Sequence, residues 1–230
     1  SSVEPVSVPG ASLVTLTQEQ AAAASSTSRS LLIVAVAGSG KTTVLIERIC
    51  AFLRAGVSPE LIAMTTFTAD VATALRTRIA ARSGQASLAT RVTIGTFHSL
   101  GLKLCRAEAA TFGYDTRFRV ANDRDAERLA GGLARQAGVS PAEWLRRMDH
   151  ARMPGTIVTP AMTESLRQWR TVLLEARVLD YTELLARPIA LLEDPVRRAA
   201  WQAKWPILLV DEYQDASPLE TRFLQLLAGG

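Results

Sequence analysis

The chain has 230 residues, of which 48% are hydrophobic and 21% are charged. This length fits one large domain, or one domain with an inserted sub-domain, and the apolar fraction is sufficient for a packed core. The net charge of +4 suits a nucleic-acid partner only weakly, because acidic and basic residues are interspersed. We expect neither a secretory signal nor a membrane span, since no apolar run approaches ~20 residues.

The amino-terminal residues and the cysteines carry little functional information. Residues 1–12 are small and dotted with proline, so we expect a flexible tail. Cys50 and Cys105 lie inside helical patterns and lack the spacing of metal ligands. Two such cysteines are typical of a reducing compartment, which favours a cytoplasmic protein.

An apolar run at residues 31–36 predicts a buried strand, and a glycine-rich turn follows it. Glycines let the backbone curve around an anion, and a helix predicted from Lys41 would direct the positive end of its dipole at the same charge. Lys41 would meet the β- and γ-phosphates of a nucleotide, and the Thr42 hydroxyl would hold Mg²⁺. Ala35 replaces the first glycine of the usual pattern. We predict a variant phosphate-binding loop with Ala37, Gly38, Ser39, Gly40, Lys41, Thr42 and Thr43.

Strands and helices alternate along much of the remaining chain. Further strands are predicted at 61–65, 91–94 and 207–210, and helices at 43–53, 71–81, 97–109 and 219–228. This alternation predicts an α/β fold, with a parallel sheet covered by helices on both faces. The interval 112–178 contains no predicted strand but three amphipathic stretches, at 124–137, 141–148 and 162–176. We interpret it as a helical insertion.

The apolar run at 207–210 ends in two adjacent acids, Asp211 and Glu212. This is the pattern of a Walker B strand, in which one carboxylate reaches Mg²⁺ and the next orients and deprotonates the attacking water. We predict Asp211 as the metal ligand and Glu212 as the catalytic base. An acidic turn after a buried strand is the alternative. The long separation between Lys41 and Asp211 is explained by the insertion.

Taken in order, these segments resemble the amino-terminal part of a superfamily 1A DNA helicase of the UvrD/Rep/PcrA type. The matching segments are LTQEQ at 16–20 (the Q motif), TTFT at 65–68 (motif Ia), GTFHSL at 95–100 (the next DNA-contacting motif), FRV at 118–120 (the start of sub-domain 1B), LDYTELL at 179–185 (the segment before motif II) and DEYQD at 211–215 (motif II).

The resemblance implies a RecA-like P-loop NTPase domain 1A at 13–111 and 179–230, with a small helical sub-domain 1B at 112–178. It implies ATP and Mg²⁺ as cofactors and single-stranded DNA, or a single-strand/double-strand junction, as partner. Gln20 would read adenine, and Gln214 would link the γ-phosphate region to DNA. The implied DNA contacts are Phe67, Thr68, Thr96, Phe97 and His98.

Aromatic faces stack on bases without regard to sequence, which agrees with these DNA contacts. The alternatives are core positions for Phe67 and Phe97 and a plain helix-entry glutamine at Gln214. Ala69 and Asp70 depart from the family pattern, because an acid lies where a phosphate backbone would run. Thr43 also departs from it, at a position where arginine is usual.

The chain ends where motif III would begin, so the resemblance implies that a second motor domain with its arginine fingers lies outside it. We expect a monomeric fragment that binds Mg-ATP weakly and hydrolyses it poorly. The whole protein would act in DNA repair or recombination in the bacterial cytoplasm, associated with the nucleoid. Two alternatives remain: the start of a RecB/AddA-type helicase-nuclease, and a nucleotide-binding module that does not move on DNA.

Several conspicuous residues receive structural interpretations. The four tryptophans lie mostly at helical spacing and are predicted to pack in the core, and His150 is predicted to be a solvated surface residue. Arginine-rich helical stretches at 124–135 and 146–152 would either touch duplex DNA or form a solvated face with paired charges, since acids are interleaved with them.

Overall fold

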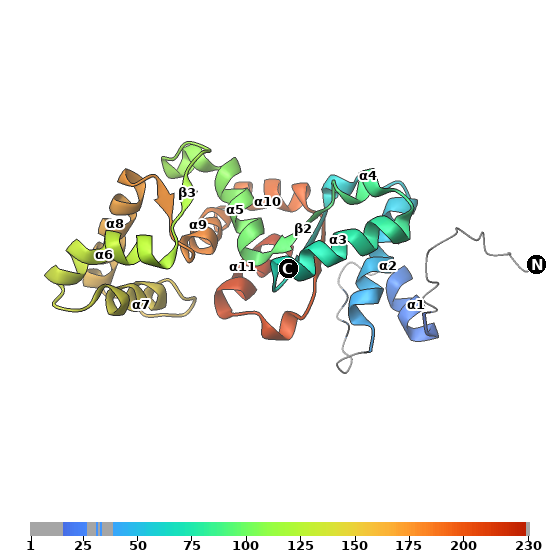
Figure 1. The fold of residues 1–230 in the computed structure, drawn as a ribbon, viewed down its shortest axis with the longest axis horizontal. Coiled ribbons are helices and arrows are strands. Elements are labelled where there is room, and N and C mark those ends of the chain that lie inside the picture. The colour runs from blue at the N-terminus through green and yellow to red at the C-terminus, as the bar shows by residue number, and fades with distance from the viewer. Residues whose placement is uncertain (1–15, 27–30, 32, 34–38, 229–230) are drawn as a thin grey trace, which may run out of the picture. The chain divides into compact units, whose positions relative to one another are not determined.

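The computed structural model describes residues 16–26, 31, 33 and 39–228, which form two compact units (Figure 1). Unit 1 contains the described residues up to Thr96 together with Lys204–Asp211, and unit 2 contains Phe97–Ala203 and the described residues from Glu212. The predicted tail at 1–12 lies outside the described residues, as does most of the predicted strand at 31–36. The domain boundaries expected from the family resemblance are a different division and stay a prediction.

Unit 1 is built on a parallel sheet in the order β2-β1-β5. The strands are β1 (Ile62–Thr66), β2 (Thr93–Thr96) and β5 (Ile207–Val210), and Met64 in β1 lies opposite Ile94 and Leu209 in its two neighbours. Every residue of β1 is buried, as expected for the central strand of a parallel sheet. The α/β class predicted from the sequence is confirmed.

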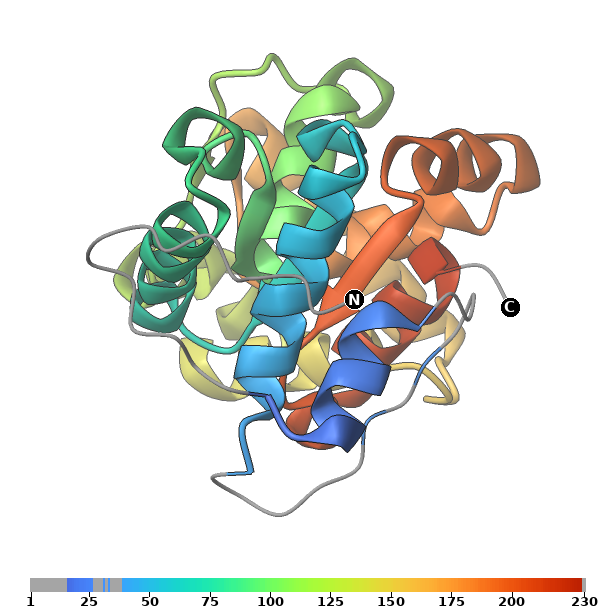
Figure 2. The same ribbon diagram turned by 90° about the vertical axis from the view of Figure 1, so that its right-hand side faces the viewer.

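The helices of unit 1 are α1 (Gln18–Ser25), α2 (Lys41–Arg54), α3 (Ala69–Ser83) and the short α4 (Ala86–Ala89), with a 3-10 turn at Pro59–Leu61. Figure 2 shows α1 beside α2. The apolar side chains of α2 and α3 form one buried core with the sheet: Ile46, Ile49, Leu53, Leu75 and Ile79 with Ile62, Met64, Ile94 and Leu209. This core fixes the start of α2 relative to the strands.

Unit 2 is mostly helical. Its helices are α5 (Phe97–Ala107), α6 (Asp123–Gln136), α7 (Pro141–Ala151), α8 (Pro160–Glu175), α9 (Glu183–Leu192), α10 (Pro195–Lys204, whose last residue belongs to unit 1) and α11 (Pro218–Ala228), with 3-10 turns at Ala109–Phe112 and Tyr213–Asp215. Asn122, Ser140 and Thr159 cap α6, α7 and α8 by accepting a hydrogen bond from the backbone three residues on.

The interval 112–178 is not free of strands, contrary to the prediction. β3 (Arg119–Val120) pairs in parallel with β4 (Val178–Leu179), and both are too short for period-2 alternation to reveal them. The three helices predicted there do form. The tryptophans pack as expected, with Trp144 and Trp169 in edge-to-face contact inside the core. No helix in the described ranges is long and apolar enough to cross a membrane.

Candidate nucleotide site and DNA-contact residues

The start of α2 has the features of an anion-binding helix end. Gly40 caps the helix with a φ of 85°, in the left-handed region that favours glycine, and it has no side chain that could cap the helix by a hydrogen bond. The first turn contains no acidic residue. A phosphate placed there would complete these donors and meet the positive end of the dipole. Ala37 and Gly38 of the predicted loop lie outside the described residues.

Gln20 connects α1 to this loop. Its Oε1 accepts from the Thr17 backbone N–H at 2.9 Å in a capping box, and its Nε2 donates to the Ser39 carbonyl at 2.7 Å. The contact depends on Gly40, because a Cβ atom there would lie 2.8 Å from Gln20 Nε2. The side chain predicted to read adenine is therefore held at the loop by its own hydrogen bonds. Its role toward adenine stays a prediction.

Thr42 and Asp211 meet although 169 positions separate them in the sequence. Thr42 Oγ1 donates to Asp211 Oδ2 at 3.2 Å, across the end of the sheet. The Asp211 backbone N–H donates to the Thr65 carbonyl at 3.0 Å, so β5 stays beside β1 up to this carboxylate, which is buried. A hydroxyl and a carboxylate are the hard oxygen donors that Mg²⁺ prefers, so the residues fit the predicted metal.

Lys41 and Thr43 flank Thr42 in the first turn of α2, and both are half-buried. Thr43 Oγ1 accepts a hydrogen bond of 3.2 Å from Arg78 Nη2 of α3. A guanidinium therefore lies beside Thr43 even though the sequence has no arginine at that position. The sequence pattern gave no sign of this contact, because Arg78 is one of several polar residues on an amphipathic helix.

Glu212, the predicted base, has an unusual backbone in unit 2. Its φ is 52°, and among the described non-glycine residues only Arg177 shares a positive φ. Such a conformation is costly for a residue with a side chain and is often found at functional positions. Glu212 Oε2 accepts from Gln214 Nε2 at 2.6 Å, and the same amide lies 3.3 Å from Asp215 Oδ2. Gln214 therefore contacts the predicted base directly.

The predicted DNA contacts of unit 1 lie at strand ends. Phe67 follows β1 and is 36% exposed. Thr68 is exposed, but its hydroxyl accepts from the Val71 backbone N–H at 3.2 Å as the cap of α3. Thr96 ends β2 and is half-buried. Asp70 lies exposed in the first turn of α3, where the positive end of the helix dipole stabilises a negative charge.

In unit 2, Phe97 and His98 have different environments. Phe97 is 1% exposed in the first turn of α5, which favours the alternative of a core position, and its role toward DNA stays a prediction. His98 stacks on Tyr181, with ring centroids 3.7 Å apart and planes 14° from parallel. Burial lowers the pKa of His98, although Glu220 at 3.9 Å opposes the shift. Tyr181 remains 58% exposed.

Comparison with protein-family models identifies the family of the chain. Residues 16–153 and 134–230 match, in two overlapping segments, the model of the UvrD/REP helicase N-terminal domain. The chain belongs to this family. The resemblance inferred from the motifs is thereby confirmed, together with the fold class expected from it.

Individual relatives are similar over most of the chain. The ATP-dependent DNA helicase Rep of Escherichia coli (strain K12) is 30% identical over 215 residues, which cover 86% of this chain and 32% of that protein. Rep of Buchnera aphidicola subsp. Acyrthosiphon pisum is 27% identical, and DNA helicase II of E. coli (strain K12) is 28% identical. These two alignments cover 85% and 86% of this chain, and 33% and 29% of the relatives. This UvrD/REP domain therefore spans about a third of the length of the relatives it matches.

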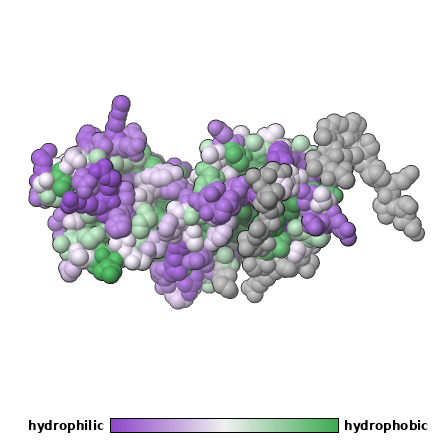
Figure 3. All heavy atoms as spheres, turned by 90° about the horizontal axis from the view of Figure 1, so that it is seen from below, coloured by the Kyte–Doolittle hydropathy of each residue, from purple (hydrophilic) through white to green (hydrophobic). Residues whose placement is uncertain are grey.

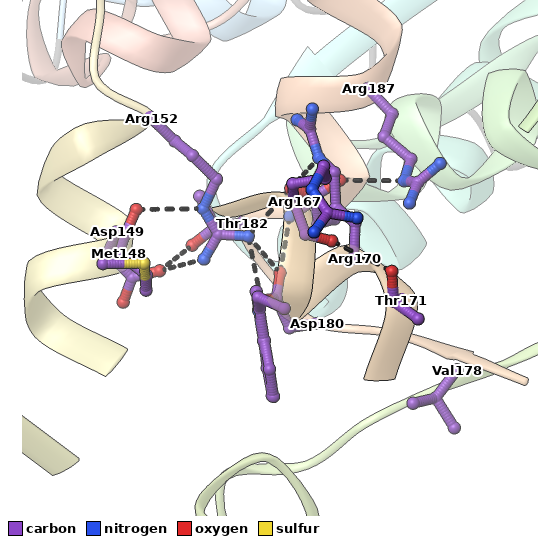
Figure 4. A network of polar contacts seen from close by, with 12 residues as sticks. Met148, Asp149, Arg152, Arg167, Arg170, Thr171, Val178, Asp180, Thr182 and Arg187 are labelled. Atoms are coloured by element: carbon purple, nitrogen blue, oxygen red, sulfur yellow. Dashed lines mark hydrogen bonds and ion pairs between the residues drawn. The ribbon is translucent and has the colours of Figure 1, made fainter. Parts of the chain in front are cut away.

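Unit 2 of this UvrD/REP domain also contains a buried ion cluster that the sequence did not reveal (Figure 4). We define the Arg152 cluster as Asp149, Arg152, Asp180 and Glu183. The Arg152 side chain is 2% exposed, and it was expected on a solvated or DNA-facing surface. The expectation was wrong because Arg152 lies just after the last turn of α7, where the helix no longer sets which way the side chain points.

Several other arginines of this helical region form exposed ion pairs, as the solvated interpretation expects. Arg128, Arg146, Arg147 and Arg167 each pair with an acid three or four residues earlier on the same helix. On the face shown in Figure 3, hydrophilic and hydrophobic residues are interspersed. His150 is exposed, as predicted. These local pairs compensate part of the positive charge that duplex DNA would meet.

Proposed function

We propose that the chain is the ATP-binding part of an ATP-dependent DNA helicase or translocase that moves on single-stranded DNA. The observation that carries the proposal is the contact between Thr42 and Asp211, which joins the two halves of a nucleotide-metal site. The names of the relatives, Rep and DNA helicase II, support the same activity. A second motor domain of the same protein would complete the nucleotide site.

Each residue of the nucleotide site has a distinct part in this proposal. Lys41 and the N–H groups at the start of α2 bind the phosphates, and Gln20 contacts adenine while it holds the loop. Mg²⁺, held by Thr42 and Asp211, neutralises charge on the phosphates. Glu212 accepts the proton of the attacking water. Gln214, which contacts Glu212, relates the state of this base to the DNA side.

Nucleotide binding is tested by calorimetric titration of the 230-residue chain with Mg-ATP. Lys41→Ala should abolish binding, because the ammonium that meets the phosphates is lost. Lys103→Ala is the matched control, since Lys103 is also a lysine but lies exposed on α5. Asp211→Asn should remove the dependence of binding on Mg²⁺. Retained affinity in Lys41→Ala would refute the phosphate-loop assignment.

We propose two separate DNA contacts, one at Phe67 in unit 1 and one at the His98–Tyr181 stack in unit 2. Both present an aromatic ring that is at least partly exposed, and base stacking on such rings is tolerant of sequence. Tyr181 is added by the structure, because its exposure and its contact with His98 are visible only in the folded chain. Fluorescence anisotropy with a labelled single-stranded oligonucleotide should show weaker binding for Phe67→Ala and Tyr181→Ala.

The position of Asp70 favours a second candidate, a nucleotide-binding module that does not move on DNA. This exposed acid lies two residues after Thr68, where it would repel a phosphate backbone. Anisotropy with and without a non-hydrolysable ATP analogue separates the candidates. Binding that strengthens in Asp70→Asn supports the helicase, and absence of binding in all states supports the module.

A further inference from the structure

The turn between β4 and α9 separates two kinds of side chain. Asp180, Thr182 and Glu183 make polar contacts with other elements of unit 2, and Asp180 and Glu183 are buried. Tyr181, between them, is more than half exposed and lies on His98. The turn therefore has three anchored residues around one presented aromatic ring.

Arg152 is the centre of the anchoring contacts (Figure 4). Its Nη1 donates to both carboxylate oxygens of Asp180, at 2.9 and 2.8 Å, and to Glu183 Oε1 at 3.0 Å. Its Nη2 donates to Asp149 Oδ1 at 2.6 Å, and its Nε to the Met148 carbonyl at 3.2 Å. A planar guanidinium with five donors fixes such an arrangement, which a lysine could not reproduce.

Further donors from other elements hold the same turn. Trp169 Nε1 donates to Asp180 Oδ2 at 2.6 Å, and Thr182 Oγ1 donates to Asp149 Oδ1 at 2.7 Å. Arg170 donates to Glu183, and Arg187 Nε lies 2.8 Å from Glu183 Oε2 as an ion pair without hydrogen-bond geometry. Three arginines thus balance the three acids, Asp149, Asp180 and Glu183.

The Arg152 cluster could contribute to the stability of unit 2 or to the conformation of the turn. Replacing a buried ion network by well-packed apolar residues is often neutral or stabilising, so net stability is a weak reason for its presence. A fully satisfied network does restrict the chain to one conformation. Here the restricted segment is the four-residue turn that carries Tyr181.

We propose that Arg152 is a positioning residue, whose cluster holds Tyr181 against His98 with its outer face open to a nucleobase. The last clause rests on the proposed binding of single-stranded DNA. The positioning itself can be measured without DNA. Arg152 touches neither the nucleotide nor the base in this proposal, since it acts through Asp180, Glu183 and the turn between them.

Proton NMR of the histidine rings measures the position of Tyr181. The chain has two histidines, so two sets of imidazole signals are expected. The His98 ring, stacked at 3.7 Å, should be shifted upfield by the ring current of Tyr181, and exposed His150 serves as the internal reference. Tyr181→Ala defines the position of the unstacked His98 signal.

Two variants loosen the cluster in different ways. Arg152→Lys keeps the charge but loses the planar donors, and Trp169→Phe keeps a ring but removes the indole donor to Asp180. In both, the His98 signal should move most of the way toward its position in Tyr181→Ala. The matched controls are Arg167→Lys, a surface arginine on α8, and Trp144→Phe, which alters the same apolar core. Both controls should leave the His98 signal in place.

The outcome that overturns the proposal is an unchanged His98 signal in folded Trp169→Phe, with circular dichroism verifying the fold. An equal shift in Trp144→Phe would overturn it too, because general loosening of the core would then be sufficient. If Arg152→Lys folds, its His98 signal tests the proposal in the same way. If Arg152→Lys does not fold, the result for Trp169→Phe decides.

DNA binding is measured separately, by anisotropy with a labelled oligothymidine. Tyr181→Ala should weaken binding ~10-fold, the typical effect of losing one stacked base. Trp169→Phe should weaken it in the same direction, with no additional loss in the double variant. A shifted His98 signal together with unchanged DNA affinity in Tyr181→Ala would refute the proposed DNA contact but leave the positioning role intact.

Discussion

The nucleotide region of unit 1 and the Arg152 cluster of unit 2 use polar groups in opposite ways. At the start of α2, backbone donors have no side-chain cap, and a hydroxyl and a carboxylate approach each other as metal ligands do. In the Arg152 cluster, one arginine pairs with three acids, and Arg152, Asp180 and Glu183 are buried. In our proposal a ligand completes the first arrangement, whereas the second consists of contacts within the protein.

The pKa values of Arg152 and Glu183 reflect the contacts within the Arg152 cluster. Burial by itself would lower the pKa of Arg152, but Asp180, Glu183 and Asp149 raise it above its ordinary value. Burial would likewise raise the pKa of Glu183, but Arg152, Arg170 and Arg187 lower it. The buried charges therefore depend on their partners, and removal of Arg152 would leave Asp180 and Glu183 buried without their main partner. In the proposed nucleotide site, by contrast, the charges of Lys41 and Asp211 would be balanced by the bound ligand and its metal.

The largest expected effect is that of Arg152→Ala on stability. Removing this cation leaves Asp180 and Glu183 buried without their main partner, which should cost about 3–5 kcal/mol of unfolding free energy. Urea denaturation followed by circular dichroism measures the loss. Lys41→Ala should change the same quantity by less than Arg152→Ala does, while abolishing nucleotide binding. If both variants lost stability equally, the contrast between the two regions would be wrong.

A smaller effect is expected from Gly40→Ala in the nucleotide region. The left-handed φ costs about 1–3 kcal/mol for a residue with a Cβ atom, and that atom would also displace the Gln20 amide from the loop. Gly84→Ala is the matched control, because Gly84 also has a positive φ, of 65°, but a Cβ atom there would meet nothing within 4 Å.

Thermal denaturation should show a loss of stability in both glycine variants, and calorimetry should show weaker ATP binding in Gly40→Ala alone. Equal nucleotide affinity in the two variants would mean that the contact between Gln20 and the loop does not matter for binding.

The two regions differ, for a physical reason, in how clearly the sequence predicts them. A phosphate-binding loop requires particular residue types at consecutive positions, so Gly40, Lys41 and Thr42 predict it directly. Asp211 was predicted because a buried strand precedes it. The short strands β3 and β4 were missed, since two residues carry no periodicity.

The Arg152 cluster is formed by scattered residues on several elements, and each of them resembles an ordinary surface residue in the sequence. The amphipathic pattern of α7 placed Arg152 with its solvated neighbours, and only the packing of α7 against the turn before α9 buries it. The burial of Phe97 was not apparent from the sequence either, because an aromatic residue at a strand end is compatible with both a core and a DNA-facing position.

The smallest predicted effect concerns His98, at the border between the anchored turn and the exposed aromatic ring. Burial lowers its folded pKa below the ordinary value of 6.5, so the unfolded chain binds more protons between these two values. Its contribution to stability is therefore complete above pH 6.5 and is lost as the pH falls toward the folded pKa. The lowered pKa of Glu183 acts in the same direction, but only below about its ordinary value of 4.5.

Thermal denaturation between pH 5 and pH 7.5 should thus isolate His98. The melting temperature of the wild type and of His150→Gln should decrease as the pH is lowered from 7.5 to 5. The decrease should be smaller in His98→Gln. An identical slope in all three proteins would show that the stacked ring does not titrate differently on folding. The stack on Tyr181 would then be too loose to exclude water, which would weaken the case for a firmly positioned aromatic ring.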